Sequence, residues 1–554
     1  MQARQIYSYF RQIPKFIGPG FMIGVGYLDP GNWATDMEGG SGFGYRLLFI
    51  ILLSNIIAIF LQNLTIRLGT VTGYDLASAS RRYFPKYVNL FLYVLAELAI
   101  IATDMAEVIG SAIALNLLFP KLPLPAGVAI TAVDVFIILM FYKEEAMDPG
   151  ASVEASSMRA LRFFETFVMM LVGAVGICLT VILAYSDANA VDVLKGYVPT
   201  REIFTDTQCL YVAIGIVGAT VMPHNLYLHP YIVQARCREW RVKRPQIEPV
   251  ESDEQGDTWK LRQEHQHVNN WSFDELRTYL DKSLRNNLHY GFIDLIVALI
   301  FAFYINSAIL VVAGSNFYYG PQQQQVQDLF SAHDLLSRYL GPGAGVMFAL
   351  ALLCAGQSST ITATLAGQVV MAGFLGMTTR PWIRRVVTRL VAITPAMVAA
   401  CVAGRSGLGN LLVGSQVALS IQLSFAVVPL VIFTSWKKVM KMDVAVSQPT
   451  ESSVLASKQT MTGMDWIIAQ ISSLLWERRK QQEKETASNI SIKPNATVLD
   501  DCMSVASKNT IIVDKLPEPL YYQNGLIVTV VAVLIALLLI GLNGFLVVSL
   551  FLGL

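Results

Sequence analysis

The chain has 554 residues, of which 54% are hydrophobic and 15% are charged, and its formal net charge is +1. Soluble domains average about 25% charged residues, so this composition excludes an ordinary soluble protein and indicates a lipid solvent. The near-neutral balance, with basic residues in short clusters between apolar runs, gives no support for nucleic-acid binding. The six cysteines are scattered, without the spacing of a zinc motif or a disulfide framework.

Eleven apolar runs are long enough to cross a bilayer whose hydrocarbon core is about 30 Å thick. They lie near residues 17–41, 46–68, 88–118, 126–143, 161–185, 208–233, 287–314, 331–361, 386–404, 410–434 and 525–553. Several contain polar residues, so we expect them to pack in a bundle with protein neighbours. The sequence therefore predicts an all-α integral membrane protein with eleven transmembrane helices.

The distribution of Lys and Arg in the short loops favours a cytosolic N-terminus. With that orientation, the cytosolic loops contain basic clusters at 81–86, 236–244 and 437–441, whereas the opposite loops contain few basic residues. An odd number of spans then places Leu554 on the far side of the membrane. We expect this membrane to be the plasma membrane or an endosomal or vacuolar membrane.

The predicted organisation has four parts: a cytosolic segment 1–15, a ten-span core 16–435, a polar loop 436–520 and an eleventh transmembrane helix 521–554. A second polar cytosolic loop, 236–286, interrupts the core, and a short helix is expected within it at 272–284. The composition of 436–520, rich in Ser, Thr, Lys and Gln, is typical of disorder. We expect the cytosolic loops to contact regulatory proteins or ubiquitin-ligase adaptors.

Two of the spans are interrupted, the first at Asp29-Pro30-Gly31-Asn32 and the sixth at Met222-Pro223-His224-Asn225. Proline removes a helical hydrogen bond and frees a carbonyl, and a free carbonyl at membrane depth persists only where it lines a polar cavity. Either proline alone would indicate an ordinary kink. Interruptions at corresponding positions of spans 1–5 and 6–10 instead indicate a LeuT-like inverted-repeat transporter with its substrate near the bilayer midplane.

The two interruptions offer ligands for a metal ion. Asp29 supplies a carboxylate, Asn32 an amide oxygen, and the freed carbonyl of Ala219 a third oxygen. Oxygen ligands alone would admit Ca²⁺ and Mg²⁺, whereas the thioether of Met222 favours a first-row transition-metal ion. A lone methionine in an apolar helix is usually a packing residue, but its position directly before Pro223 favours a ligand role.

The third span carries three carboxylates, Glu97, Asp104 and Glu107. Their spacing keeps them within about 80° on one face of a helix, and carboxylates at this depth are typical of proton relays or ion sites. For Glu97, pairing with a neighbouring donor is an equally good interpretation. Asp294 is expected to be a hydrogen-bond or ion-pair partner that supports packing. For Asn306, a packing role and a role in a proton relay or ion site both stay open.

Asp-Pro-Gly-Asn in the first span, together with Ala-x-x-Met-Pro-His-Asn in the sixth, resembles the NRAMP family of proton-coupled divalent metal transporters. The likeness covers roughly residues 15–435 and extends to 101–107, to 356–362 and to Ser415 with Gln416. The length and the long loop before the last span look most like the fungal Smf-type members, whose usual substrate is Mn²⁺. One departure is Gln422-Leu423-Ser424, where the family usually has Gln-Leu-Pro, and it bears on how the tenth span bends.

This resemblance implies a role for individual residues, with the metal as substrate and no bound cofactor. The implied metal ligands are Asp29, Asn32, Ala219 through its carbonyl, Met222 and, in some states, Gln416. The implied proton-handling groups are Asp29, His224, Asp104 and Glu107, with Arg384 and Arg385 as the basic end of the route and Glu97 added from the pattern of the third span. For His224, bracing the unwound segment by hydrogen bonds is nearly as good an interpretation as a proton relay.

These observations predict a secondary active transporter that imports Mn²⁺, and also Fe²⁺, Co²⁺ or Cd²⁺, toward the cytosol with protons by alternating access. One alternative is an organic-solute carrier of the same fold, which would not need Met222. Another is a non-transporting metal sensor or receptor, which would be expected to carry a large folded soluble domain. An enzyme is disfavoured because the sequence contains no nucleophile–base set and no cofactor-binding loop.

Overall fold

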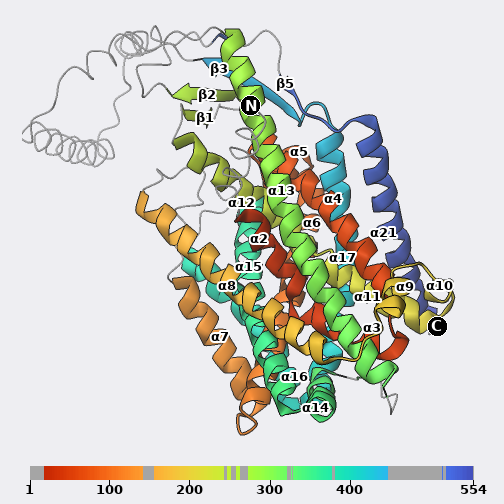
Figure 1. Ribbon diagram of the computed structural model, residues 1–554. Helices are drawn as coiled ribbons and strands as arrows, with labels where there is room; N and C mark the ends of the chain where they lie inside the picture. Colours follow the sequence, from red (N-terminus) through yellow and green to blue (C-terminus); the bar gives the residue numbers. More distant parts are fainter. Residues whose placement is uncertain are drawn as a thin grey trace, which may run out of the picture. The chain divides into compact units, whose positions relative to one another are not determined.

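The computed structural model describes residues 18–140, 155–242, 246–250, 258–262, 273–320, 326, 328–376, 381–402, 404–446, 514–515 and 520–552. Within these residues the chain is almost entirely helical (Figure 1), which confirms the predicted all-α class. Eight of the described helices are long and apolar enough to cross a membrane, so the count of eleven is not confirmed. They are Leu48–Thr72, Lys86–Leu118, Thr166–Tyr185, Thr207–Gln234, Asp281–Tyr318, Pro342–Leu375, Gly407–Ser435 and Leu526–Val548.

The first predicted span consists of three short pieces. They are the helix α2 (Pro19–Gly24), the 3₁₀ helix η2 (Val25–Leu28) and the helix α3 (Pro30–Phe43). Asp29 between them is extended (φ −65°, ψ 162°) and caps α3, because its side chain accepts a hydrogen bond from the Asn32 amide. Pro30 occupies the first position of α3, where no backbone N–H is needed. The helix therefore restarts at Pro30 and does not run through it.

The first half of the bundle continues with four helices, α4 (Leu48–Thr72), α5 (Leu76–Tyr83), α6 (Lys86–Leu118) and α7 (Leu124–Met140). The helix α8 (Ala155–Tyr185) and the short helices α9 (Ala190–Gly196) and α10 (Glu202–Thr205) lead to the sixth span. That span is split into α11 (Thr207–Thr220) and α12 (Pro223–Val242), again at a proline.

The second half continues with α13 (Phe273–Ala313), the π-helical turn η4 (Gly314–Tyr318) and α14 (Leu329–Leu340). The helices α15 (Pro342–Leu375), α16 (Pro381–Val402), α17 (Gly404–Ser435) and α21 (Leu526–Leu552) follow. The short helix expected at 272–284 is the first part of α13 and is continuous with the seventh span.

The predicted start of the eighth span was wrong. Residues 331–340 belong to the separate helix α14, which Asp328 caps by accepting a hydrogen bond from Ser331 N at 2.7 Å. The chain turns at Gly341, whose φ of +95° suits glycine, and α15 begins at Pro342. Gly341-Pro342-Gly343 marks this junction in the sequence, and Ser337 and Arg338 precede it.

The chain divides into two compact units. The first comprises Met1–Trp240, Thr278–Lys441 and Leu520–Leu554, and the second comprises Arg241–Arg277 and Met442–Pro519. In the second unit β1 (Gln246–Val250) pairs antiparallel with β2 (Thr258–Arg262), with Gln246 opposite Arg262. β3 (Lys441–Val446) runs parallel to β2 and antiparallel to β4 (Asp514–Lys515). A last short strand, β5, covers Leu520–Tyr521. All the candidate site residues belong to the first unit.

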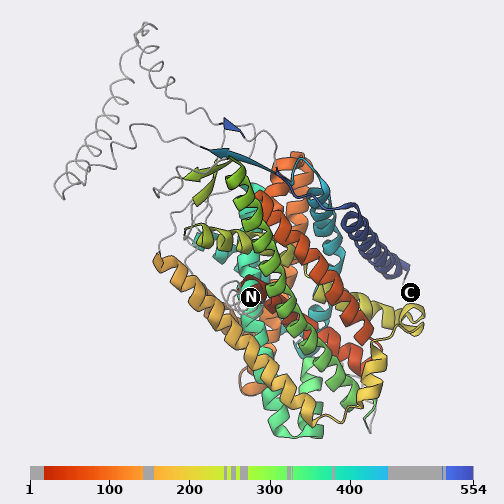
Figure 2. The same ribbon diagram turned by 45° about the horizontal axis from the view of Figure 1, so that its top comes forward.

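Two glycines allow backbones in the bundle to approach closely. A Cβ atom added to Gly110 of α6 would lie 2.1 Å from Pro30 Cβ, so α6 packs directly on the first interruption. A Cβ added to Gly218 of α11 would lie 2.6 Å from the Gln416 carbonyl oxygen of α17. Figure 2 shows the crowded bundle around these helices, with the dark-blue helix α21 at its edge. Both interruptions are thus enclosed by neighbouring helices.

Candidate functional site

Asp29 and Asn32 form one side of the candidate metal site. Asp29 Oδ1 accepts hydrogen bonds from the Asn32 backbone N at 2.8 Å and from Asn32 Nδ2 at 2.7 Å. Asp29 Oδ2 is buried and has no hydrogen-bond partner among the described residues. Since a buried carboxylate oxygen is costly to leave unpaired, this atom is well suited to accept a proton or a cation.

The second interruption supplies Ala219 and Met222. The helical partner of the Ala219 carbonyl would be the N–H of Pro223, which does not exist, so Pro223 frees this oxygen for another donor. Asn32 Nδ2 donates to it at 3.1 Å, and the Asn32 side chain therefore joins the two interrupted spans. Met222 follows in the short gap between α11 and α12, and its side chain is fully buried.

Gln416 comes to the site from α17. A Cβ atom added to Gly31 would lie 1.9 Å from Gln416 Nε2, so the amide of Gln416 lies against the first interruption and only a glycine leaves room for it. Gln416 Nε2 donates to Ser415 Oγ at 3.1 Å, and Gln416 Oε1 is buried without a partner among the described residues. The structure thus brings Gln416 to the same place as Asp29, Asn32 and the Ala219 carbonyl.

The chemistry of this set is that of a weakly charged cation site. Asp29 is its one ionisable ligand, accompanied by neutral oxygens and a thioether. Among the described residues there is no group of three or more His, Cys, Asp or Glu that could hold a metal ion. Because ligand charge and rigidity tune metal affinity, a set with one carboxylate suits a cargo ion that must leave again.

His224 connects the second interruption to the third span. Its Nδ1 lies 3.3 Å from Thr103 Oγ1 on α6, and Thr103 Oγ1 donates to the Ala99 carbonyl at 3.0 Å. With its own hydrogen used in that way, Thr103 can only accept from His224, which places the proton on Nδ1. His224 Nε2 is then a buried acceptor, and it has no partner among the described residues.

The predicted proton-handling carboxylates lie on α6, close in sequence to Thr103, the residue that contacts this histidine. Asp104 directly follows Thr103, and both Asp104 and Glu107 are buried, at 2% and 1% exposed. Glu97, two turns earlier in α6, is half-buried. Arg384 and Arg385 belong to α16, but their side chains lie outside the described part of the chain, so their place in the route stays a prediction.

Sequence reasoning missed a second buried histidine, His229. Its Nδ1 lies 2.8 Å from Gln62 Oε1 and 3.3 Å from Thr65 Oγ1, both on α4, and Gln62 Nε2 donates to the Tyr27 hydroxyl at 3.1 Å. This network joins α12, α4 and the 3₁₀ turn before Asp29. Its signal in the sequence is a second histidine in the same interrupted span, five residues after His224.

The helix α13 supports the first interruption. Asp294 accepts hydrogen bonds from Gly18 N at 3.3 Å and from Gly20 N at 2.6 Å, so it satisfies the start of α2. Asn306 Nδ2 donates to the Tyr27 carbonyl at 3.0 Å, just before the chain leaves its helical path. Asp294 is therefore a hydrogen-bond partner, as expected, and Asn306 has the same kind of role.

Asn225 is a further polar side chain for which the sequence suggested no role. It is fully buried, and neither atom of its amide has a hydrogen-bond partner among the described residues. A Cβ added to Gly26 would lie 2.5 Å from Asn225 Nδ2, so the amide faces the turn before Asp29.

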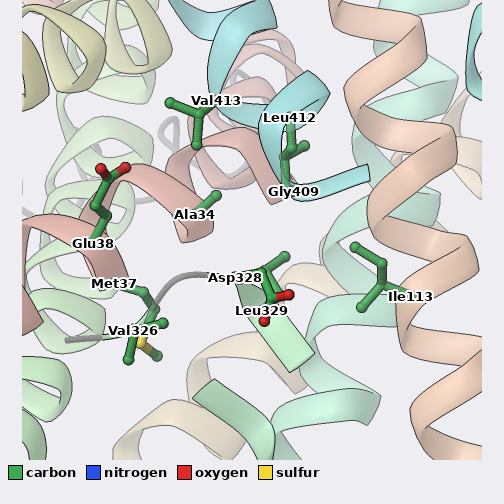
Figure 3. Close-up of a pocket in the computed structure, with 10 residues that line it drawn as sticks. All are labelled: Ala34, Met37, Glu38, Ile113, Val326, Asp328, Leu329, Gly409, Leu412 and Val413. Atoms are coloured by element: carbon green, nitrogen blue, oxygen red, sulfur yellow. The ribbon is translucent and has the colours of Figure 1, made fainter. Parts of the chain in front are cut away.

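A small pocket lies beside α3, beyond the candidate ligands (Figure 3). It is lined by Ala34, Met37 and Glu38 of α3, Ile113 of α6, Val326, Asp328 and Leu329 at the start of α14, and Gly409, Leu412 and Val413 of α17. The candidate ligands do not line it, although α3 and α17 contribute to both places. Asp328 is engaged as the cap of α14, so the pocket is not itself a metal site.

Comparisons with known proteins identify the family of this chain. The family model described as natural resistance-associated macrophage protein-like (Nramp) matches residues 20–464. The manganese transporter SMF1 of Saccharomyces cerevisiae is 45% identical over 447 residues, which cover 80% of this chain and 75% of that protein. The manganese transporter pdt1 of Schizosaccharomyces pombe is 42% identical over 468 residues, which cover 84% and 83% of the two chains.

Among solved structures, that of the manganese transporter of Eremococcus coleocola is 28% identical. It aligns with a TM-score of 0.62 and covers 98% of this chain and 96% of that chain. The relatives are named as transporters and not as enzymes. Since the family model spans most of the chain and the relatives are similar over most of their own length, this multi-pass membrane protein belongs to the Nramp family.

Proposed function

We propose that this chain imports divalent transition-metal ions, Mn²⁺ foremost, toward the cytosol together with protons, by alternating access between the two sides of the membrane. Fe²⁺, Co²⁺ and Cd²⁺ are further substrates. The metal is the cargo, and its ligands are Asp29, Asn32, the Ala219 carbonyl and Met222, with Gln416 added in some states. The names of the relatives, which are manganese and divalent metal cation transporters, support this substrate class.

The observation that carries this proposal is that the side-chain amide of Asn32 contacts both interrupted spans. Asn32 Nδ2 lies within hydrogen-bonding distance of Asp29 Oδ1 and of the Ala219 carbonyl. Asp29 Oδ2 and Gln416 Oε1 are buried oxygens without partners among the described residues. A divalent cation would satisfy these oxygens together, and the buried thioether of Met222 adds a preference for a transition metal.

Protons are proposed to leave the site along α6. A cation that binds Asp29 competes with a proton for the same carboxylate. His224 offers a buried acceptor, Nε2, and is hydrogen-bonded through Nδ1 to Thr103, beside Asp104. The proposed route passes through the Asp104/Glu107 pair and then Glu97 toward Arg384 and Arg385.

The proposed orientation has a cytosolic N-terminus, in a plasma, endosomal or vacuolar membrane. In this orientation the pocket beside α3 lies on the outer side of the candidate ligands, and its carboxylates, Glu38 and Asp328, would attract an arriving cation. The polar loops 236–286 and 436–520 would face the cytosol, where regulatory proteins or ubiquitin-ligase adaptors could reach them.

The test is Mn²⁺ uptake by the Asp29→Ala protein in reconstituted vesicles with an imposed pH gradient, acidic outside. We expect uptake to fall to the level of empty vesicles, because the variant lacks the one charged ligand and the primary proton acceptor. Asp192→Ala is the matched control, since Asp192 is an exposed carboxylate that pairs with Lys195, and it should transport normally. Wild-type uptake by Asp29→Ala would contradict the proposed function.

A further inference from the structure

The last helix, α21, carries a buried amide in an otherwise apolar sequence. Of its span, 22% is buried inside the structure, and large side chains such as Leu526, Ile527 and Leu534 are exposed. Ala532, Leu539 and Leu546 are buried, and so is one polar residue, Asn543, which is only 6% exposed. An amide at membrane depth needs partners, because lipid offers none. Asn543 therefore marks the face by which α21 is attached to the bundle.

The partners of Asn543 are two serines one turn apart on α17. Asn543 Nδ2 donates to the Ser420 carbonyl at 2.6 Å and to Ser424 Oγ at 3.1 Å. Ser420 Oγ donates in return to Asn543 Oδ1 at 2.8 Å. Both atoms of the amide are thus engaged, and one turn of α17 is held by three hydrogen bonds.

This turn of α17 is next to the candidate metal site. Ser420 follows Gln416 by four residues, so it lies one helical turn away on the same side of α17. A Cβ added to Gly218 would lie 2.6 Å from both the Gln416 carbonyl oxygen and Ser420 Cβ. The helices α17 and α11 are therefore in close contact here, with no room for a side chain at Gly218. The helix α11 in turn ends at Ala219 and Thr220, just before Met222.

The helix α21 also contacts α11 directly. Leu546, one turn after Asn543, is buried in a cluster with Ile214 of α11 and Val417 of α17. The partly buried Leu210, Tyr211, Ile421 and Leu542 pack against this cluster. Both helices that bring metal ligands to the site from the second repeat are therefore in contact with α21, which lies along the edge of the bundle in Figures 1 and 2.

We propose that Asn543 is a positioning residue for substrate binding, which sets the height and rotation of α17 through Ser420 and Ser424 and so places Gln416 at the metal. This inference rests on the proposed metal site. It gives α21, the last described helix, a part in substrate affinity.

The experiment measures Mn²⁺ uptake by the full chain in reconstituted vesicles as a function of Mn²⁺ concentration. For Asn543→Leu we expect the apparent KM to rise about tenfold while the maximal rate per transporter stays within about twofold. The matched control is Asn524→Leu. Asn524 is also 6% exposed and donates to Thr434 Oγ1 at 2.9 Å, but at the C-terminal end of α17, away from Gln416. If α21 only anchors the bundle, both variants should lower the amount of functional protein and leave KM unchanged, which would overturn the proposal.

A double-mutant cycle tests whether the effect passes through Gln416. The KM of Asn543→Leu/Gln416→Ala should equal that of Gln416→Ala alone, since a missing side chain cannot be misplaced. Additive effects would overturn the proposal. If Asn543→Leu does not reach the membrane, Ser424→Ala removes one of the three hydrogen bonds and should raise KM by a smaller factor. An unchanged KM for Ser424→Ala would then count against it.

Different experimental results would contradict the positioning role of Asn543 and the proposed transport function. Wild-type Mn²⁺ uptake by Asp29→Ala contradicts the function. An unchanged KM for Asn543→Leu, in a protein that Asp29→Ala inactivates, overturns the positioning role alone.

Discussion

At the scale of single residues, the candidate site combines one charge, several neutral oxygens and one sulfur atom. Asp29 supplies the charge and is the only ligand that can exchange a metal ion for a proton. The neutral oxygens cannot separate Mn²⁺ from the far more abundant Ca²⁺ and Mg²⁺, because all three ions accept oxygen ligands. In the proposed site, the discrimination would depend on the thioether of Met222, whose side chain is buried in the gap between α11 and α12.

Met222→Ala should relax this discrimination. We expect the apparent affinity for Mn²⁺ to fall about tenfold, a free-energy change of about 1.4 kcal/mol, while excess Ca²⁺ becomes an effective competitor. The measurement is Mn²⁺ uptake in the presence of increasing Ca²⁺ or Mg²⁺. Met22→Ala is a suitable control, because Met22 is a buried methionine of the first span that is not a candidate ligand. Equal competition profiles for wild type and Met222→Ala would reject the ligand role and favour an organic-solute carrier.

Gly31→Ala tests the approach of Gln416 to the site. The added methyl group would lie 1.9 Å from Gln416 Nε2, so the flexible amide must move away while the backbone stays in place. We expect the apparent KM for Mn²⁺ to rise about tenfold without loss of folded protein, because alanine favours a helix more than glycine does. Gly173→Ala in α8 has no atom within 4 Å of its new methyl group and should behave like wild type. A normal KM for Gly31→Ala would remove Gln416 from the site.

At the scale of helices, an interrupted span needs neighbours that replace its missing hydrogen bonds. The helix α13 does this for the first interruption: Asp294 satisfies the first N–H groups of α2, and Asn306 satisfies the Tyr27 carbonyl. A Cβ added to Gly20 would lie 2.7 Å from the Asp294 backbone, so the two helices are also in close contact. We therefore expect α2 and α13 to move as one body when the transporter changes state.

Asp294→Asn should weaken this attachment. An asparagine keeps one acceptor oxygen and turns an N–H group toward a backbone N–H, so one of the two bonds to α2 is lost. We expect the free energy of unfolding to fall by about 1–3 kcal/mol, measured by thermal or denaturant unfolding in detergent. The exposed control Asp192→Asn should stay within about 0.5 kcal/mol of wild type. If both variants unfold like wild type, the cap on α2 contributes nothing to stability.

Much of the helical arrangement around the site could be predicted because proline acts locally. Pro30 and Pro223 mark the two interruptions, and the residues beside them, Asp29 and Met222, follow directly. The contact of Gln416 with Gly31 could not be derived in this way, since it depends on how two distant helices pack, and only the family resemblance indicated it. The supporting role of His229 was missed for the same reason, and that of Asn306 was left open, because their partners lie on other helices.

At the scale of the whole molecule, orientation decides the direction of transport. The predicted arrangement places the connection between α8 and α11 outside and the end of α17 inside. Lys195 and Lys438 are exposed side chains in these two places. If the protein imports metal ions in this orientation, the ions enter on the side of the pocket beside α3 and are released on the side of the basic clusters.

Cysteine labelling can test this orientation. In a cysteine-free background, Lys195→Cys should react with a membrane-impermeant maleimide in sealed, right-side-out vesicles, whereas Lys438→Cys should react only after permeabilisation. Both side chains are exposed, so a difference in labelling reports the side of the membrane and not burial. Labelling of both positions from the same side would rule out the predicted topology, and the reverse pattern would place the N-terminus outside.

The amide of Asn32 has a consequence for turnover. Its nitrogen donates both to Asp29 and to the Ala219 carbonyl, so the side chain joins α3 and α11. To present its oxygen to an ion at this place, the amide would have to turn by about half a rotation, and these two internal hydrogen bonds would be exchanged for metal–oxygen contacts. The free energy of ion binding is then the difference between the metal-bound arrangement of the amide and its hydrogen-bonded arrangement. A carrier built on such an exchange can hold its ion selectively and still let it go quickly.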